Sequence, residues 1–222
     1  MRQLYHTHLS PFCRKVRMLL KEKNLDFELV CENPWDRKLE VFALDPAGEV
    51  PVLVEEDGTV VSSAYAICEY LEDVYPDITL IGTTPAERAE VRRLVGWFDH
   101  KFDYEVTQKI LFEKVFKHYV HNGEVDTAVV RAGQNHMLYH LDYIGHLAGS
   151  RYFLAGDNLT LADLAAAAHL SALDYLGDVP WDYNEAAHDW YALMKSRPSL
   201  RHILIERVHG VRPPVYYENP DF

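Results

Sequence analysis

A serine and a cysteine at the start of a predicted helix, Ser10 and Cys13, have the types and spacing that suit thiol chemistry. Ser10 precedes an amphipathic pattern, and Pro11 fits the first position of a helix. Backbone N–H groups and the helix dipole favour an anion at such a helix end. A cysteine in this place can have a lowered pKa, and a serine hydroxyl can donate a hydrogen bond to a thiolate. This turn is the first candidate site.

The elements that must position the turn alternate between strands and helices over residues 1–76. Runs rich in β-branched residues predict the strands, and Asp57-Gly58 predicts a hairpin turn between the last two. A helix is predicted over Ser62–Leu71. The predicted strands are Gln3–His6, Asp26–Val30, Val50–Glu55 and Thr59–Val61.

Residues 84–210 have an almost wholly helical pattern. Thr84 and Glu87 predict an N-cap and a capping-box carboxylate for a long helix. Thr160 and Asp163 predict a second capping box, with the structural role of starting a buried, alanine-rich helix. The predicted helices cover residues 84–121, 125–149, 161–176, 185–196 and 199–209. The predicted organisation is a domain at 1–76, a linker at 77–83, a domain at 84–210 and an extended tail at 211–222.

Composition and charge restrict the class of protein. Acidic residues outnumber basic ones 34 to 22, and the net charge of −12 repels a nucleic-acid backbone. The longest apolar run falls short of the ~18–20 residues of a membrane span. Cysteines at 13, 31 and 68 form an odd, widely spaced set that suits a reducing compartment. We therefore expect a cytoplasmic, globular protein that binds no nucleic acid and spans no membrane.

Histidine pairs offer a weaker candidate site. His136 and His140 are four residues apart on a predicted helix, and His6 and His8 lie on a strand. Neither pair has a third ligand at a spacing typical of a metal site. We expect no bound metal.

Segment 10–13 resembles the Cys-x-x-Cys redox turn of thioredoxins and glutaredoxins, with Ser10 in place of the attacking cysteine. That replacement excludes an internal disulfide. Four further segments resemble glutathione S-transferases, in the order found in that family: 45–54, 62–71, 160–163 and 197–201. The resemblance implies an N-terminal α/β domain, thioredoxin-like with the order βαβαββα, and an all-α C-terminal helical bundle. It also implies a homodimer.

The same resemblance implies a glutathione site. Pro51 would follow a cis bond, and the backbone of Val50 would pair with the cysteinyl part of glutathione. Ser62 and Ser63 would open the next helix beside the tripeptide, and Ser10 would stabilise its thiolate. Cys13 has the position of the resolving cysteine, which leaves it either reactive or packed in the interior.

Two residues depart from the family pattern at this site. Ser62 stands where many members have Glu, Asp or Gln, so the expected partner of the glutathione ammonium is missing. Glu49 stands where many have Lys or Gln, and it would repel a carboxylate. Each change removes roughly 1–3 kcal/mol of charge-assisted bonding. We expect no cofactor, and glutathione as at most a weak ligand.

The C-terminal tail is the second informative region. Its three prolines favour extended structure, and it is rich in aromatic residues. The tail either covers a groove of its own chain or docks a partner. Trp35 lies on a predicted exposed loop, and tryptophan is frequent among interface hot spots. The residues predicted to bind a partner are Trp35, Tyr216, Tyr217, Asp221 and Phe222.

The whole chain, and its ending above all, resembles an alphaproteobacterial branch of the family that includes a member binding the tubulin-like division protein FtsZ. This implies a non-conjugating regulator of cell division that binds FtsZ filaments and concentrates at the division site. The alternative is an active cytosolic glutathione S-transferase that uses Ser10. A group of residues on the long helix would line its substrate pocket or belong to the core or the dimer interface. These residues are Trp97, Phe98, Lys101, Phe102 and Tyr104.

Overall fold

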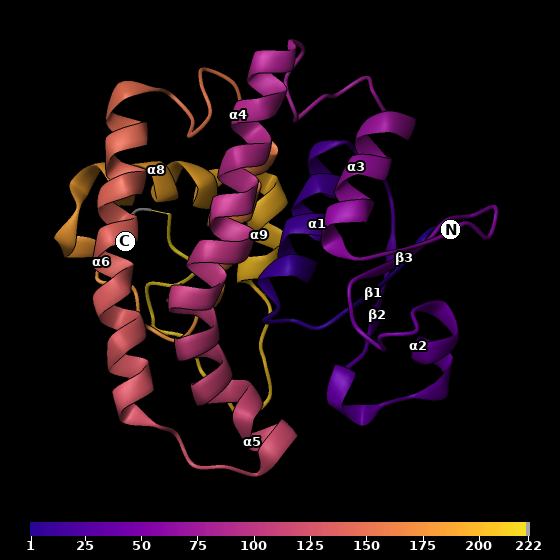
Figure 1. Cartoon of the computed structure of the whole chain (residues 1–222), viewed down its shortest axis with the longest axis horizontal. Helices are drawn as coiled ribbons and strands as arrows, with labels where there is room; N and C mark the ends of the chain where they lie inside the picture. The colour runs from indigo at the N-terminus through magenta and orange to yellow at the C-terminus, as the bar shows by residue number, and fades with distance from the viewer. Residues whose placement is uncertain (221–222) are drawn as a thin grey trace. The chain divides into compact units, whose positions relative to one another are not determined.

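The computed structural model describes residues 1–220, and these form two compact units that meet in sequence after Leu80. The change from one unit to the other falls inside the segment 77–83. Figure 1 shows strands in the first unit and helices throughout the second.

The strands of the first unit form a mixed sheet in the order β2-β1-β3-β4. β1 is parallel to β2, whereas β3 is antiparallel to both of its neighbours. Leu4 of β1 pairs with Leu29 of β2 and Leu53 of β3, and Leu4 and Leu53 are fully buried. The strands are β1 (Gln3–His6), β2 (Glu28–Cys31), β3 (Val52–Val54) and β4 (Val60–Ser62).

The first strand has the predicted bounds, and the others differ from prediction by one or two residues at their ends. β3 begins only at Val52, directly after Pro51, which has no N–H to donate to a neighbouring strand. The hairpin turn at Gly58 is confirmed, with φ of +89° at that glycine.

Helices complete the predicted order βαβαββα of the first unit. α1 and α3 pack against each other, and α1 buries its apolar side chains Val16, Leu19 and Leu20 fully. The helical segments are α1 (Pro11–Glu22), η1 (Pro34–Asp36), α2 (Leu39–Leu44) and α3 (Ala64–Val74).

A buried lysine holds the chain after α3. The Lys23 ammonium lies 2.9 Å from the Glu72 carboxylate and donates to the carbonyl oxygens of Tyr75 and Ile78. Glu72 in turn accepts the backbone N–H of Leu80. These bonds satisfy charges that would be costly to bury alone.

A long helix begins the second unit. The capping box of Thr84 and Glu87 starts it as predicted, and Asn122 ends it in a left-handed conformation. Its middle segment has π-helical winding, and side chains at every fourth position, Phe98, Phe102 and Ile110 among them, are fully buried. The segments are α4 (Pro85–Gly96), η2 (Trp97–Phe116) and α5 (Lys117–His121).

The other helices pack around this one. α6 approaches η2 closely at Gly133, where a Cβ atom would lie 2.9 Å from the side chain of Ile110. α7 is buried along its whole length and starts with the confirmed capping box of Thr160 and Asp163. The helical segments are α6 (Thr127–Ser150), α7 (Leu161–Asp174), η3 (Trp181–Tyr183), α8 (Glu185–Ser196) and α9 (Pro198–Leu204).

The last helix is shorter than predicted. α9 ends at Leu204 rather than near residue 209. Beyond it, Val208 donates its backbone N–H to the Tyr175 hydroxyl and pairs with Val211 in an isolated bridge. The bond to Tyr175 uses the Val208 N–H, which a continued helix would have bonded within itself. Within residues 1–220, no helix combines the length and apolar character needed to cross a lipid bilayer.

Candidate functional site

The Ser10 turn has the predicted local geometry. Ser10 has extended backbone angles, Pro11 occupies the first turn of α1, and the Ser10 Oγ accepts the backbone N–H of Cys13 at 3.3 Å. A hydroxyl that accepts one bond can still donate another. Ser10 is only half-buried, so its hydroxyl is chemically able to serve a ligand.

Cys13 does not have the lowered pKa that its place in the turn allowed. Its side chain is fully buried, and this burial raises the pKa of the thiol from 9.0 to about 11. Hydrogen bonds from Ser10 and the Thr7 backbone act in the opposite direction but are weaker. At neutral pH the thiol is protonated, because burial disfavours its charged form. The packed interpretation of Cys13 is the correct one.

The sheet brings the predicted glutathione-binding residues to one edge. Val52 of β3 pairs with Tyr5 of β1 and with Ser62 of β4. Because β3 is antiparallel to both, the residues before Val52 lie beside the end of β1 and the end of β4. Val50, Pro51, Ser62, Ser63 and the Ser10 turn therefore gather at this edge, with the predicted cis bond before Pro51 confirmed.

Ser63 has a strained backbone that no local sequence signal indicated. Its φ of +74° and ψ of +129° are costly for a residue with a Cβ atom. Ser63 precedes the first turn of α3, yet its side chain makes no capping bond there, and it is exposed. Two helix N-termini, those of α1 and α3, thus begin at the same edge. Such ends favour an anion.

A shallow depression near this edge includes two basic residues that the sequence analysis missed. Arg37 and Lys38 line it together with Val50, the residue before the cis bond. The Lys38 ammonium pairs with Glu32 at 2.6 Å, and the Arg37 guanidinium lies over the ring of Phe42. Two adjacent basic residues were the available signal, but their position depends on the loop conformation.

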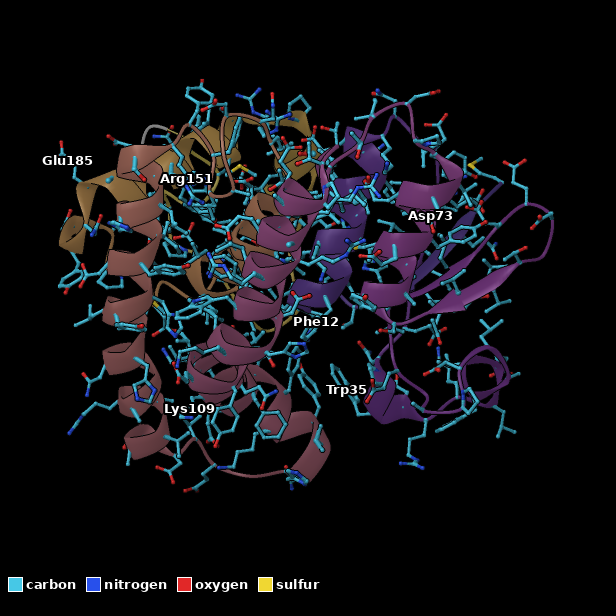
Figure 2. All side chains as sticks on the ribbon, turned by 45° about the horizontal axis from the view of Figure 1, so that its top comes forward. Phe12, Trp35, Asp73, Lys109, Arg151 and Glu185 are labelled. Atoms are coloured by element: carbon cyan, nitrogen blue, oxygen red, sulfur yellow. The ribbon has the colours of Figure 1, made fainter. Side chains whose placement is uncertain are left out.

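Trp35 and Glu49 lie on the loops around this depression. Trp35 belongs to η1 and is half-buried, and Figure 2 shows it together with Phe12 of α1 in the first unit. Glu49 is exposed, and its backbone N–H donates to the Asp45 carboxylate at 3.1 Å. The two acidic side chains make this loop electrostatically unfavourable for a carboxylate ligand.

The tail is packed on its own unit at Tyr217. This side chain is fully buried and meets Tyr175 edge to face, with ring centroids 5.1 Å apart. Tyr217 thus packs on its own chain and leaves no exposed ring surface for a partner, and its role in docking stays a prediction. Tyr216 is half-buried, and burial followed by a hydrogen bond to Asp174 raises the pKa of its phenol to about 12. Asp221 and Phe222 lie outside the described residues.

The aromatic residues of the long helix divide between core and surface. Phe98 and Phe102 are fully buried in the second unit. Tyr104 is 68% exposed, and the Lys109 ammonium lies over its ring. Trp97 is half-buried, and its indole N–H donates to His140. The core interpretation is correct for the two phenylalanines.

His140 is a buried structural histidine. Because its Nδ1 accepts the Trp97 indole N–H, its proton lies on Nε2, which is 2.9 Å from the Glu105 carboxylate. Burial lowers the pKa of His140 to about 4. His136 contacts the Glu105 backbone carbonyl at 3.2 Å. In the part of the chain that the structure describes, no group of three or more His, Cys, Asp or Glu residues is placed to hold a metal ion.

A thioredoxin-like sheet with a cis-proline beside the start of α1, followed by a helical unit, defines the class of glutathione S-transferase folds. A family model described as the glutathione S-transferase N-terminal domain matches residues 9–74. A glutathione S-transferase of Hyoscyamus muticus is 34% identical over 208 residues, with 89% of this chain and 94% of the relative covered. The chain belongs to the glutathione S-transferase family.

Within this family, the chain is similar to a particular curated protein over its full length. It is 44% identical over 224 residues to FtsZ-localized protein A of Caulobacter vibrioides. The matched region covers 100% of this chain and 98% of the relative. The solved structure of FzlA from C. crescentus matches 100% of this chain and 99% of its own, with a TM-score of 0.96. A glutathione S-transferase structure from Rhodospirillum rubrum F11 matches both chains completely, with 52% identity and a TM-score of 0.98.

Proposed function

We propose that this chain is a non-conjugating, glutathione S-transferase-fold protein that binds FtsZ filaments and regulates bacterial cell division. The observation that carries the proposal is the 44% identity to FtsZ-localized protein A, which extends over both units and the tail. Relatives named as glutathione S-transferases range from 29% identity in yeast and 34% in Hyoscyamus muticus to 52% for the Rhodospirillum rubrum structure, so the name of a relative does not by itself exclude conjugation. The protein acts in the cytoplasm and concentrates at the division site.

The site in the first unit supports the non-conjugating part of the proposal. Cys13 is buried and protonated, so it supplies no thiolate. Ser62 provides no charge for an ammonium, and Glu49 places a negative charge on an already acidic loop. Together these features leave the tripeptide without two of its charge partners. We therefore expect no glutathione affinity tighter than about millimolar.

A second function, glutathione conjugation with Ser10 as the hydroxyl donor, is supported by one feature of the geometry. Ser10, cis-Pro51 and the strained Ser63 lie at one edge of the sheet, next to two helix N-termini. Arg37 and Lys38 add positive charge nearby. This arrangement suits an anionic thiol ligand, and the fold alone does not distinguish the two functions.

Calorimetry with glutathione distinguishes them. A dissociation constant in the low micromolar range would overturn the non-conjugating proposal. The double variant Glu49→Lys and Ser62→Glu restores the two charges, so we expect it to tighten glutathione binding by at least tenfold. An unchanged affinity in this variant would show that the missing charges do not limit binding.

Co-sedimentation with polymerised FtsZ tests the partner. We propose that Trp35 contributes to the contact, because it combines a half-buried position with a large apolar ring. The variant Trp35→Ala should weaken binding by roughly 30-fold, as expected for an interface hot spot. The matched control is Tyr152→Ala, which removes an aromatic ring that is 64% exposed in the second unit. Wild-type protein that stays in the supernatant would overturn the proposal.

We also propose a homodimer. Tyr65 and Val74 expose apolar surface on α3, being 61% and 47% exposed, and Tyr139 exposes 56% of its surface on α6. A two-fold symmetric dimer would cover apolar surface on these helices. Light scattering at micromolar concentration should give twice the mass of one chain, and a monomer would contradict the proposal.

A further inference from the structure

A fully buried lysine lies beneath the C-terminal tail. Lysine is almost never fully buried unless it is paired, and Lys195 of α8 has no exposed side-chain surface. Its Nζ lies 3.6 Å from the carboxylate of Asp174, the last residue of α7, which is also fully buried. The pair therefore lies where α7 and α8 meet the tail.

The ammonium is shared between the helices and the tail. It lies within 6 Å of three tyrosine rings: 5.7 Å from the ring centre of Tyr191, 5.8 Å from Tyr216 and 5.9 Å from Tyr217. It also donates to the backbone carbonyl of Tyr216 at 3.3 Å. The last two tyrosines belong to the tail. Cation–π attraction and the hydrogen bond thus join Lys195 to the tail directly.

Asp174 is the second point of attachment. Its carboxylate accepts the Trp181 indole N–H at 2.8 Å and the Tyr191 hydroxyl at 3.3 Å, and the Tyr216 hydroxyl bonds to it as well. The tail residue Tyr216 is therefore bound through its carbonyl to Lys195 and through its phenol to Asp174. Both charges of the pair hold the same tail residue.

The rest of the tail is attached through Tyr175 of the second unit and through an ion pair between Arg207 and Glu218. The Tyr175 hydroxyl donates to the Val211 carbonyl at 3.1 Å, and its ring packs on Tyr217. Between these points, Val215 is fully exposed. Two turn bonds, from the N–H groups of Tyr217 and Asn219, close the segment on itself. The segment 208–219 is thus a strap with separate attachment points and little secondary structure.

A buried ion pair is a poor source of net stability, because the cost of removing both charges from water offsets their attraction. Burial lowers the pKa of Lys195 and raises that of Asp174, as this cost predicts. An apolar side chain of similar length could fill the space between α7 and α8 equally well. What an apolar side chain could not do is bond to the tail carbonyl and attract the tail rings.

We propose that Lys195 and Asp174 form a latch that holds the segment 208–219 in one position, and that Lys195 is the positioning residue of this strap. The strap opens as a unit while α7 and α8 stay folded. This property is independent of glutathione and of FtsZ.

Amide hydrogen exchange of the full-length protein tests the latch. The variant Lys195→Met keeps the apolar stem but removes the ammonium. We expect exchange at Tyr217 and Asn219 to accelerate by at least tenfold, while amides in the middle of α7 and α8 keep their protection. The matched control is Lys117→Met, which breaks a pair with Glu113 at 2.8 Å in the same unit. It should leave exchange in the tail unchanged.

Two results would overturn the proposal: unchanged exchange of the tail amides in Lys195→Met, or an equal loss of protection in the tail and in both helices. A second measurement uses the wild-type protein, in case the variant does not fold. Nuclear magnetic resonance of lysine labelled with nitrogen-15 should show a slowly exchanging Lys195 ammonium with contacts to the rings of Tyr216 and Tyr217. A rapidly exchanging ammonium without these contacts would also overturn the latch.

Discussion

The Ser10 turn and the C-terminal tail both contain side chains whose chemistry suggests function. In each of them, the structure buries one residue and leaves a residue close to it in sequence accessible. In the turn, Ser10 is half-buried and caps a helix, whereas Cys13 is fully buried three residues later. In the tail, Val215 is fully exposed, whereas Tyr217 is fully buried. Residue type indicates what a side chain can do. The direction in which it points decides whether it can do so.

The two regions differ in how that direction arises. The turn is specified locally, by a capping serine and a first-turn proline, and helical geometry then directs Cys13 inward. The tail has few bonds within itself, and its direction comes from distant residues of the same unit, Tyr175, Asp174 and Lys195. The conformation of the Ser10 turn can therefore be predicted from local sequence signals, whereas that of the tail cannot.

The largest expected effect is that of Tyr217→Ala. The variant removes a fully buried ring and leaves a cavity beside Tyr175. We therefore expect the free energy of unfolding to fall by about 3 kcal/mol. Urea denaturation measures this loss. The control Val215→Ala, at a fully exposed position, should stay within about 0.5 kcal/mol of wild type. Equal stability of the two variants would show that the Tyr217 ring is not packed in the interior and would contradict the contrast with Val215.

A smaller effect concerns Cys13 and alkaline pH. The folded thiol has a pKa of about 11, raised by burial from 9.0, so the unfolded chain loses its proton at lower pH than the folded chain. The stabilising contribution is therefore complete below pH 9 and is lost as pH rises from 9 to about 11. It amounts to about 2–3 kcal/mol.

The free energy of unfolding of wild type and Cys13→Ala, measured against pH, isolates this contribution. The difference between the two proteins should shrink above pH 9, because the variant lacks the thiol. A thiol reagent at pH 8 should label the exposed Cys31 well before the buried Cys13. Labelling of both at the same rate would show that Cys13 is accessible and reactive.

Ser10→Ala tests the accessible half of the turn. It removes the bond from Ser10 Oγ to the Cys13 N–H, and loss of an N-cap costs about 1 kcal/mol of stability. Ser10→Gly should cost only a few tenths of a kcal/mol of stability. Thermal unfolding distinguishes these variants, and an alanine variant as stable as wild type would show that the cap contributes nothing.

The smallest expected effect has the opposite sign. Ser63 has a φ of +74°, which glycine adopts without steric cost. Because the Ser63 side chain makes no capping bond, Ser63→Gly should raise the stability by about 0.5–1 kcal/mol. Unchanged or lower stability would mean that the serine side chain stabilises this conformation in a way that outweighs the strain.

The sequence by itself determined the elements and much of their order. Caps at Ser10, Thr84 and Thr160 could be read because the groups that bond are only a few residues apart. The strand β1 and the helix α8 have the predicted bounds, and the order βαβαββα followed from the resemblance. Boundaries next to tertiary contacts, such as the end of α9, were placed less well because distant residues compete for the backbone groups.

Only the tertiary structure decided which of the candidate residues face inward. The burial of Cys13 and Tyr217, the strain at Ser63, and the place of Arg37 and Lys38 near cis-Pro51 all depend on residues distant in sequence. Burial changes the chemistry of a group, because removing it from water shifts its pKa or conceals its apolar surface. Residue type and spacing do not indicate which side chains are buried in this way. The roles of these residues could therefore be assigned only from the folded chain.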